Sequence, residues 1–167
     1  MSRSGARRRF GTQACGHHGR MTIPTYEEAR LAPLVTDVEI ERRVDALIGR
    51  ANQRQLWLVF LDDEQVQLPL LIPVDHLPAE LPDDDARRFA ISISDTARAV
   101  GAHSVVLVLE ELHGPDITAG DREWARAMHS ACDEEGIAVR GILLSHRGGV
   151  RWIPQDDYRA ASTKIVP

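Results

Sequence analysis

The stretch VVLVLEELHGPDITAGDREWARAMHSACDEEGI, from Val105 to Ile137, predicts a strand, a polar loop and a helix in succession. It begins with an apolar run of strand length, which is typical of a strand buried on both faces. Trp124, Met128 and Ala131 then recur on one helical face, and Gly136 is a residue type that commonly ends a helix. The loop between the two elements contains the side chains that could form a site: Glu110, Glu111, His113 and Asp116.

The flanking segments extend this pattern to a mixed α/β fold. Thr36 and Glu39 have the spacing of a capping box and predict the start of a helix. Two apolar segments around a turn of three acids predict a hairpin. We expect a mixed sheet with helices on its faces, in the order α-β-β-α-β-α-β-β. The predicted helices cover residues 36–51 and 118–135, with another between them that has three acids near its start and ends at Gly101. The predicted strands cover residues 55–61, 66–73, 104–110, 137–145 and 150–154.

The chain is expected to form one domain over residues 36–155. Its 167 residues, of which 43% are hydrophobic, suffice for one core. A basic head of residues 1–20, expected to be disordered, and a linker of residues 21–35 precede this domain, and a frayed tail of residues 156–167 follows it. A start codon at Met21 is one explanation for the head, and a tail that contacts nucleic acid is the other.

Charge and composition argue against several classes of function. The net charge is −5, and the head carries five arginines and no acid, which leaves −10 for the rest of the chain. An acidic body argues against nucleic-acid binding, because phosphate neutralisation needs a basic face. No apolar run approaches the roughly 18 residues of a membrane span. The two cysteines, Cys15 and Cys132, make no disulfide framework, so we expect a cytoplasmic protein, and the composition is compatible with a bacterial source.

The polar loop after the buried strand is the candidate site. Metal-assisted hydrolysis needs about three protein ligands and one open position, and the loop offers several acids but one histidine, His113. Thr118 and Asp121 also have capping-box spacing, so Asp121 has a structural use as well. Cys132 follows His129 by three residues, but a cysteine inside a helix lacks the environment that activates a thiol, and we expect it to be packed.

The element order and the candidate loop resemble the MPN or JAB domain, in its RadC-like bacterial branch, over roughly residues 36–154. The most specific match is the helix TAGDREWARAMHSACDEEGI, which follows a Ser-x-x-Asp-like motif, and the turn LLSHRGGVRWI agrees as well. The resemblance implies a zinc held by a His-x-His pair at the strand end and by the aspartate of that motif. It also implies a glutamate beside the first strand that activates the bound water.

Carried over residue by residue, this zinc site is incomplete. The aspartate falls on Asp121 and the serine on Thr118, but the two histidines fall on Val108 and Glu110. The positions of the helper glutamate hold Gln53, Arg54 and Gln55. A valine has no lone pair, so we expect a domain without zinc or another cofactor and assign no catalytic residue. A rearranged metal site would use Glu111, His113 and Asp121.

Three functional hypotheses follow. The first is a non-catalytic, protein-binding or scaffolding module, a pseudoenzyme that contacts an unknown protein or a second copy of itself. Its expected contact surfaces are the hairpin edge near Pro69 and a loop that contains Glu110, Glu111, His113, Asp116 and Thr118. The alternative is a divergent metal-dependent hydrolase of peptide or isopeptide bonds. The third, a nucleic-acid-associated protein, rests on the arginine head and on the DNA-repair label of RadC.

Overall fold

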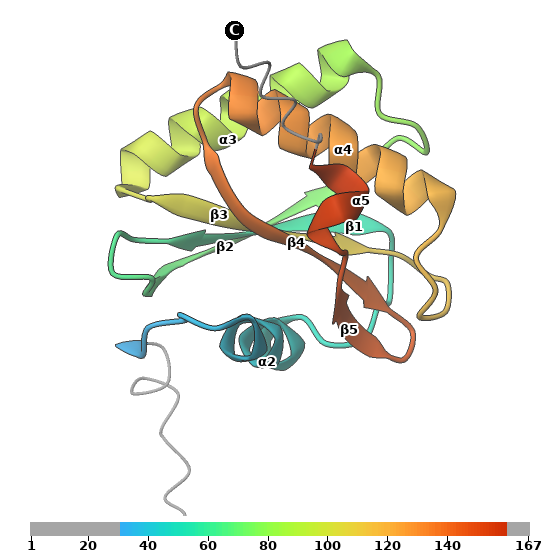
Figure 1. Ribbon diagram of the computed structural model, residues 1–167, viewed down its shortest axis with the longest axis horizontal. Helices are drawn as coiled ribbons and strands as arrows, with labels where there is room; N and C mark the ends of the chain where they lie inside the picture. Colours follow the sequence, from blue (N-terminus) through green and yellow to red (C-terminus); the bar gives the residue numbers. More distant parts are fainter. Residues whose placement is uncertain (1–30, 160–167) are drawn as a thin grey trace, which may run out of the picture.

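The computed structural model describes residues 31–159, and its central sheet lies between helices on both faces (Figure 1). Helix α2 covers one face, and α3, α4 and the short α5 cover the other. The helices are α2 (Asp37–Leu47), α3 (Asp83–Val100), α4 (Ala119–Glu134) and α5 (Gln155–Tyr158), and the strands are β1 (Gln55–Leu61), β2 (Gln67–Asp75), β3 (Ser104–Glu110), β4 (Ala138–His146) and β5 (Gly149–Trp152). The predicted mixed α/β class is confirmed.

The sheet has the strand order β2-β1-β3-β4-β5, with β3 and β4 parallel and the other neighbours antiparallel. Every residue of β3 is buried, as its continuous apolar run predicted. Because side chains alternate along a strand, Leu107 and Leu109 belong to the core under α3 and α4, whereas Val106 and Val108 belong to the core under α2. This alternation decides to which face each polar residue at the end of β3 is directed.

Local signals in the sequence place the helix ends. Thr36 and Glu39 form a capping box at the start of α2, and Thr118 and Asp121 form another at the start of α4. Helix α3 ends at Gly101, whose φ of 71° lies in the left-handed region that glycine tolerates best. Trp124, predicted to be a core residue, is buried beneath α4.

Two predictions at the domain boundaries need correction. Leu34, in the predicted linker, is buried in the α2 core, so the folded part begins before the α2 cap. The predicted frayed tail begins instead with α5, because Tyr158 is buried under α4 and its ring contacts His129. The predictions for residues 1–20, and for the remaining residues of the linker and the tail, lie outside the described residues.

Strand β5, at one end of the sheet, contacts α2 through Trp152. The Trp152 ring lies over Gly141 of β4, where an added Cβ atom would come within 2.2 Å of it. The Trp152 Nε1 donates to the main-chain oxygen of Asp37 at 3.2 Å. A side chain at position 141 would therefore displace the tryptophan that connects β5 with α2. Within residues 31–159, no helix is long and apolar enough to cross a membrane.

Candidate functional site

Glu110, at the end of β3, is a buried carboxylate with four hydrogen-bond donors around it. Its Oε1 accepts from the main-chain N of Asn52 at 2.7 Å and of Gln53 at 3.3 Å. Its Oε2 accepts from Gln55 Nε2 at 2.6 Å and from Trp57 Nε1 at 2.8 Å. Burial acts to raise the pKa of Glu110, but these donors outweigh it and leave the pKa lowered. Glu110 is therefore a charged anchor for the segment that leads into β1.

Glu110 and Asp121 lie on opposite sides of the sheet. Glu110 shares its face of β3 with Val108, which packs in the α2 core, and it pairs across the strands with Gln55. Asp121 belongs to α4, which packs on the other face. The sheet therefore separates the two carboxylates. Glu110 and Asp121, the two positions to which the family's zinc ligands were transferred without a gap, cannot bind one metal ion together.

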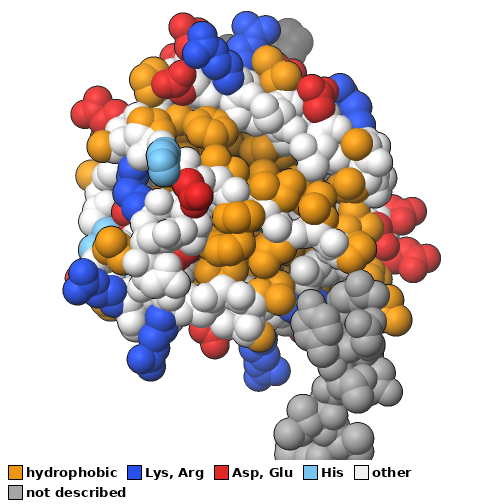
Figure 2. Space-filling view, turned by 180° about the vertical axis from the view of Figure 1, so that it is seen from behind, with side chains coloured by type: hydrophobic (Ala, Val, Ile, Leu, Met, Phe, Trp, Pro, Cys, Tyr) orange, Lys and Arg blue, Asp and Glu red, His pale blue; other side chains and the backbone are white. Residues whose placement is uncertain are grey.

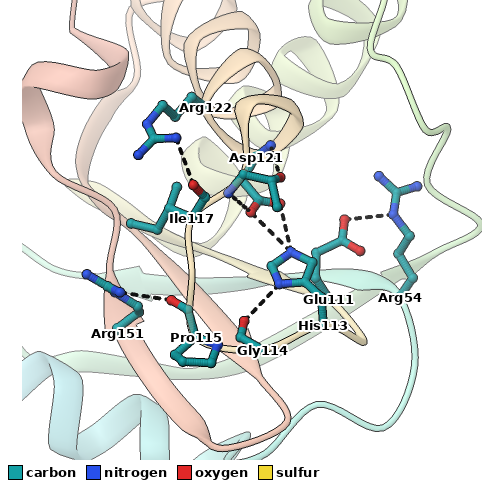
Figure 3. Close-up of polar contacts among 10 residues, drawn as sticks. Arg54, Glu111, His113, Gly114, Pro115, Ile117, Asp121, Arg122 and Arg151 are labelled. Carbon is teal, nitrogen blue, oxygen red and sulfur yellow. Dashed lines mark hydrogen bonds and ion pairs between the residues drawn. The ribbon is translucent and has the colours of Figure 1, made fainter.

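His113 and Asp121 meet at the start of α4, whereas the nearby Glu111 is directed toward Arg54 (Figure 3). The Nε2 atom of His113 lies 3.1 Å from Asp121 Oδ2 and 3.3 Å from Oδ1. Its Nδ1 lies 2.8 Å from the main-chain oxygen of Gly114. Both partners are acceptors, so both ring nitrogens are satisfied as donors only when the imidazole is protonated. When protonated, this ring clamps the loop to α4.

The remaining acids of the site are also engaged. Asp121 Oδ2 accepts from the main-chain N of Thr118 at 2.8 Å, as the capping box requires. Glu111 points away from His113 toward Arg54, whose Nε donates to it at 2.7 Å (Figure 3). Arg54 also donates to the main-chain oxygens of Leu77 and Pro78 at 2.6 and 2.9 Å. The positions at which the family resemblance implies a helper glutamate are Gln53, Arg54 and Gln55. They instead donate hydrogen bonds to Glu110 and Glu111.

Arginines from two other elements fix the loop. Arg122 of α4 donates to the main-chain oxygen of Ile117 at 2.7 Å, and Arg151 of β5 donates to that of Pro115 at 2.8 Å (Figure 3). Asp116 and Thr118 are exposed, whereas His113 is partly exposed. The loop therefore exposes Leu112, Pro115 and Asp116, while its main-chain oxygens at Pro115 and Ile117 accept from arginines of the fold.

These residues do not fit a tight zinc site. Both nitrogens of His113 lie within hydrogen-bond distance of acceptors, so a metal ion would have to displace Gly114 or Asp121 from the ring. Val108 is buried in the α2 core and has no donor atom. Among residues 31–159, no group of three histidines, cysteines, aspartates or glutamates has a metal-binding arrangement.

Two further candidates from the sequence have structural roles. Cys132 is buried in the core, and burial raises the pKa of its thiol to about 12, which disfavours the nucleophilic thiolate. In the turn between β4 and β5, His146 Nδ1 accepts from the main-chain N of Gly148 at 3.0 Å, and Gly149 has a φ of 147°. The two glycines belong to this tight turn.

The clamp predicts a pH dependence for His113. Burial acts to lower the pKa of His113, but the Gly114 carbonyl and the Asp121 carboxylate outweigh it and raise the pKa. Folding thus favours the protonated ring, and this contribution to stability is present at acidic pH and is lost as the pH rises through the folded-state pKa. In an NMR titration, the pKa of His113 should fall in an Asp121→Asn variant; an unchanged value would show that the carboxylate does not hold the proton.

A hydrophobic surface, separate from the loop, lies where β2 meets α3. Apolar side chains of both elements are partly exposed there, and Figure 2 shows hydrophobic side chains gathered on the face behind that of Figure 1. Two hollows of about 120 and 390 Å³ share Phe89 and Ser92 of α3. We call this area the β2–α3 surface; its residues are Leu68, Leu70, Ile72, Val74, Phe89 and Ser92.

Comparison of the sequence with models of known protein families, and with curated proteins, finds no match.

Proposed function

We propose that this chain is a non-catalytic protein-binding module with an MPN- or JAB-like domain, and that it binds through the β2–α3 surface. The observation that carries the proposal is the partly exposed apolar side chains of β2 and α3 around the two hollows (Figure 2). Contiguous exposed apolar patches on a folded domain often mark interaction sites, whereas single exposed apolar residues are common on any protein surface. The hairpin edge near Pro69 lies beside this surface.

The edge of β2 favours contact through side chains rather than through an added strand. Pro69 and Pro73 lie in this strand at the end of the sheet, and proline has no main-chain N–H to donate. Prolines on edge strands hinder pairing with another chain. We therefore place the partner over the Phe89 side of β2, where apolar side chains can be buried.

The contacts at the end of β3 support a role without catalysis. Glu110 is 1% exposed and fully engaged, so it is not part of the contact surface that we propose. Glu111 and Asp121 are held by Arg54 and by Thr118 and His113. Using any of these groups as a ligand or a base would require breaking contacts that stabilise the loop.

The alternative function is a divergent metal-dependent hydrolase. It is favoured by one observation, the contact between His113 and Asp121 at the start of α4, with Glu111 in the same loop. It requires His113 to lose its proton and to leave either Gly114 or Asp121. A metal that displaced Arg54 from Glu111 and the proton from His113 would support this alternative.

Site-specific crosslinking in the source cells tests the proposal. A photoreactive residue at position 70, on the β2–α3 surface, should give a discrete crosslinked species, because the partner covers that position. The matched control is position 38 of α2, where Val38 is also apolar and exposed but lies on the opposite face of the sheet. Equal crosslinking at the two positions, or none at position 70, would contradict a contact surface there.

A further inference from the structure

A hollow of about 710 Å³ lies where α4, α5 and the start of β4 meet. Helix α4 contacts both of the other elements, and α5 lies beside it in the view of Figure 1. The volume falls in the range of about 300–1,000 Å³ that is typical of small-molecule sites. None of the lining residues belongs to the loop after β3 or to the β2–α3 surface, so the hollow is a separate feature of the fold.

The α4 wall of this hollow is polar. Arg126, His129, Ser130 and Asp133 line it, and their spacings of i, i+3, i+4 and i+7 place them on one face of the helix. The apolar face of α4 packs in the core instead. Polar side chains that the core does not use are therefore directed at one hollow.

The other walls are largely apolar. Ile137 and Val139 line the hollow at the start of β4, and Tyr158 lines it from α5. Val139 and Tyr158 are buried, and the Tyr158 ring centroid lies 5.3 Å from that of His129. A ligand with an aliphatic or aromatic part would remove these walls from water.

Two arginines give the α5 end of the hollow a positive charge. Arg126 lies on α4, and Arg159 directly follows α5. The Nε of Arg126 donates to the main-chain oxygen of Asp157 at 2.8 Å, which holds its guanidinium beside α5. Within residues 31–159, neither arginine forms an ion pair, and the Asp157 carboxylate pairs with Arg122 instead. Because guanidinium groups bind carboxylates and phosphates through paired N–H donors, this end is suited to an anion.

His129 responds to the charge in this hollow. Burial lowers the pKa of His129, and Arg159 lowers it further, whereas Asp133 acts to raise it. The Tyr158 ring, which contacts that of His129, is neutral at neutral pH. An anion beside Arg159 would offset part of the effect of the arginine, so its binding should raise the pKa of His129.

We propose that this hollow binds a small organic anion, with its charged group between Arg126 and Arg159 and its apolar part against Val139 and Tyr158. Asp133, the one acid among the lining residues, lies about 10 Å from Arg126 along α4 and leaves the α5 end positive. The acidic body of the chain disfavours a polyanion such as nucleic acid. The inference goes beyond the proposed function, because this site and the β2–α3 surface share no residue and either can fail without the other.

Benzoate is the probe that tests the site, because it combines a carboxylate with an aromatic ring. Titration of the full-length chain should give a saturable change in the NMR signals of His129 and Ser130, with a dissociation constant of about 1 mM. Acetate has the charge without the ring, and benzyl alcohol has the ring without the charge, so each should bind at least about tenfold more weakly. No saturable change with benzoate, or equal binding of either control, would overturn the proposal.

Substitution of the arginines assigns the binding to this hollow. Arg126→Gln and Arg159→Gln should each raise the dissociation constant of benzoate about tenfold, because each removes one charged partner of the carboxylate. The matched control is Arg42→Gln, at an exposed arginine of α2 on the opposite face of the sheet, and it should leave the constant unchanged. Arg159 forms no ion pair with residues 31–159, so its substitution should also leave the melting temperature unchanged. Equal constants for Arg42→Gln and Arg159→Gln would contradict the site.

The pKa of His129 gives a second readout, which does not depend on a substitution. Benzoate remains ionised above about pH 6, so its own charge is constant over the titration of the imidazole. Saturating benzoate should raise the pKa of His129, and saturating benzyl alcohol should not. An unchanged or lower pKa with benzoate bound would place the anion elsewhere and overturn the proposal.

Discussion

Replacing Glu110 with alanine is expected to lower the free energy of unfolding by about 3–5 kcal/mol. The carboxylate accepts four hydrogen bonds while its side chain is 1% exposed. Its removal would leave the Gln55 amide and the Trp57 indole N–H without their acceptor in a protected environment. Buried donors that lose their partner bear the cost of desolvation without compensation, so the effect should exceed that of an ordinary surface acid.

Urea denaturation of Glu110→Ala and of Glu111→Ala provides the measurement and its matched control. Glu111 is the adjacent acid and has one partly exposed ion pair with Arg54, which contributes much less. Glu110→Gln should also destabilise the fold, because its amide NH₂ would meet donors. Equal urea midpoints for the two alanine variants would show that Glu110 is not the anchor described above.

Replacing Asp121 with alanine should lower the free energy of unfolding by about 2–3 kcal/mol. Asp121 is 4% exposed, accepts from the main-chain N of Thr118 and lies 3.1 Å from the His113 ring. Alanine would remove half of the capping box of α4 and would leave the clamp without its anion. The expected loss therefore exceeds that of a helix cap alone.

Asp121→Asn and Asp116→Ala are the informative comparisons for this variant. Asparagine can still accept from Thr118, and its NH₂ group can donate to a neutral His113, so much of the stability should remain. Asp116 is exposed in the same loop, so its loss should change the urea midpoint little. If Asp121→Ala were as stable as Asp116→Ala, the clamp would not be a stabilising element.

Much of the fold could be predicted from local sequence signals. The continuous apolar run predicted that β3 is buried on both faces, and the spacing of Thr118 and Asp121 predicted the α4 cap. These features depend on residues that are close in the chain. The helix α5 was missed because its burial depends on Tyr158 packing under α4, which four residues of sequence do not reveal.

The partners in the candidate site could not be predicted, because strand register brings them together. Gln55 lies opposite Glu110 only because β1 and β3 pair antiparallel in one register. The alternation along β3 then directs Glu110 to the α2 face, away from Asp121. Sequence spacing placed Glu111 and His113 after β3, but the pairing of Glu111 with Arg54 depends on contacts between residues far apart in the chain.

The central claim is that Glu110, Glu111, Asp121 and His113 stabilise the fold and that the chain acts by binding a partner. The zinc content of the protein tests this claim most directly. The full-length protein would be purified without chelator, incubated with zinc, dialysed and subjected to elemental analysis beside the Asp121→Asn variant. The account predicts that both retain well below one zinc per chain. Near-stoichiometric zinc in the wild-type protein, lost in Asp121→Asn, would contradict it and would favour the hydrolase.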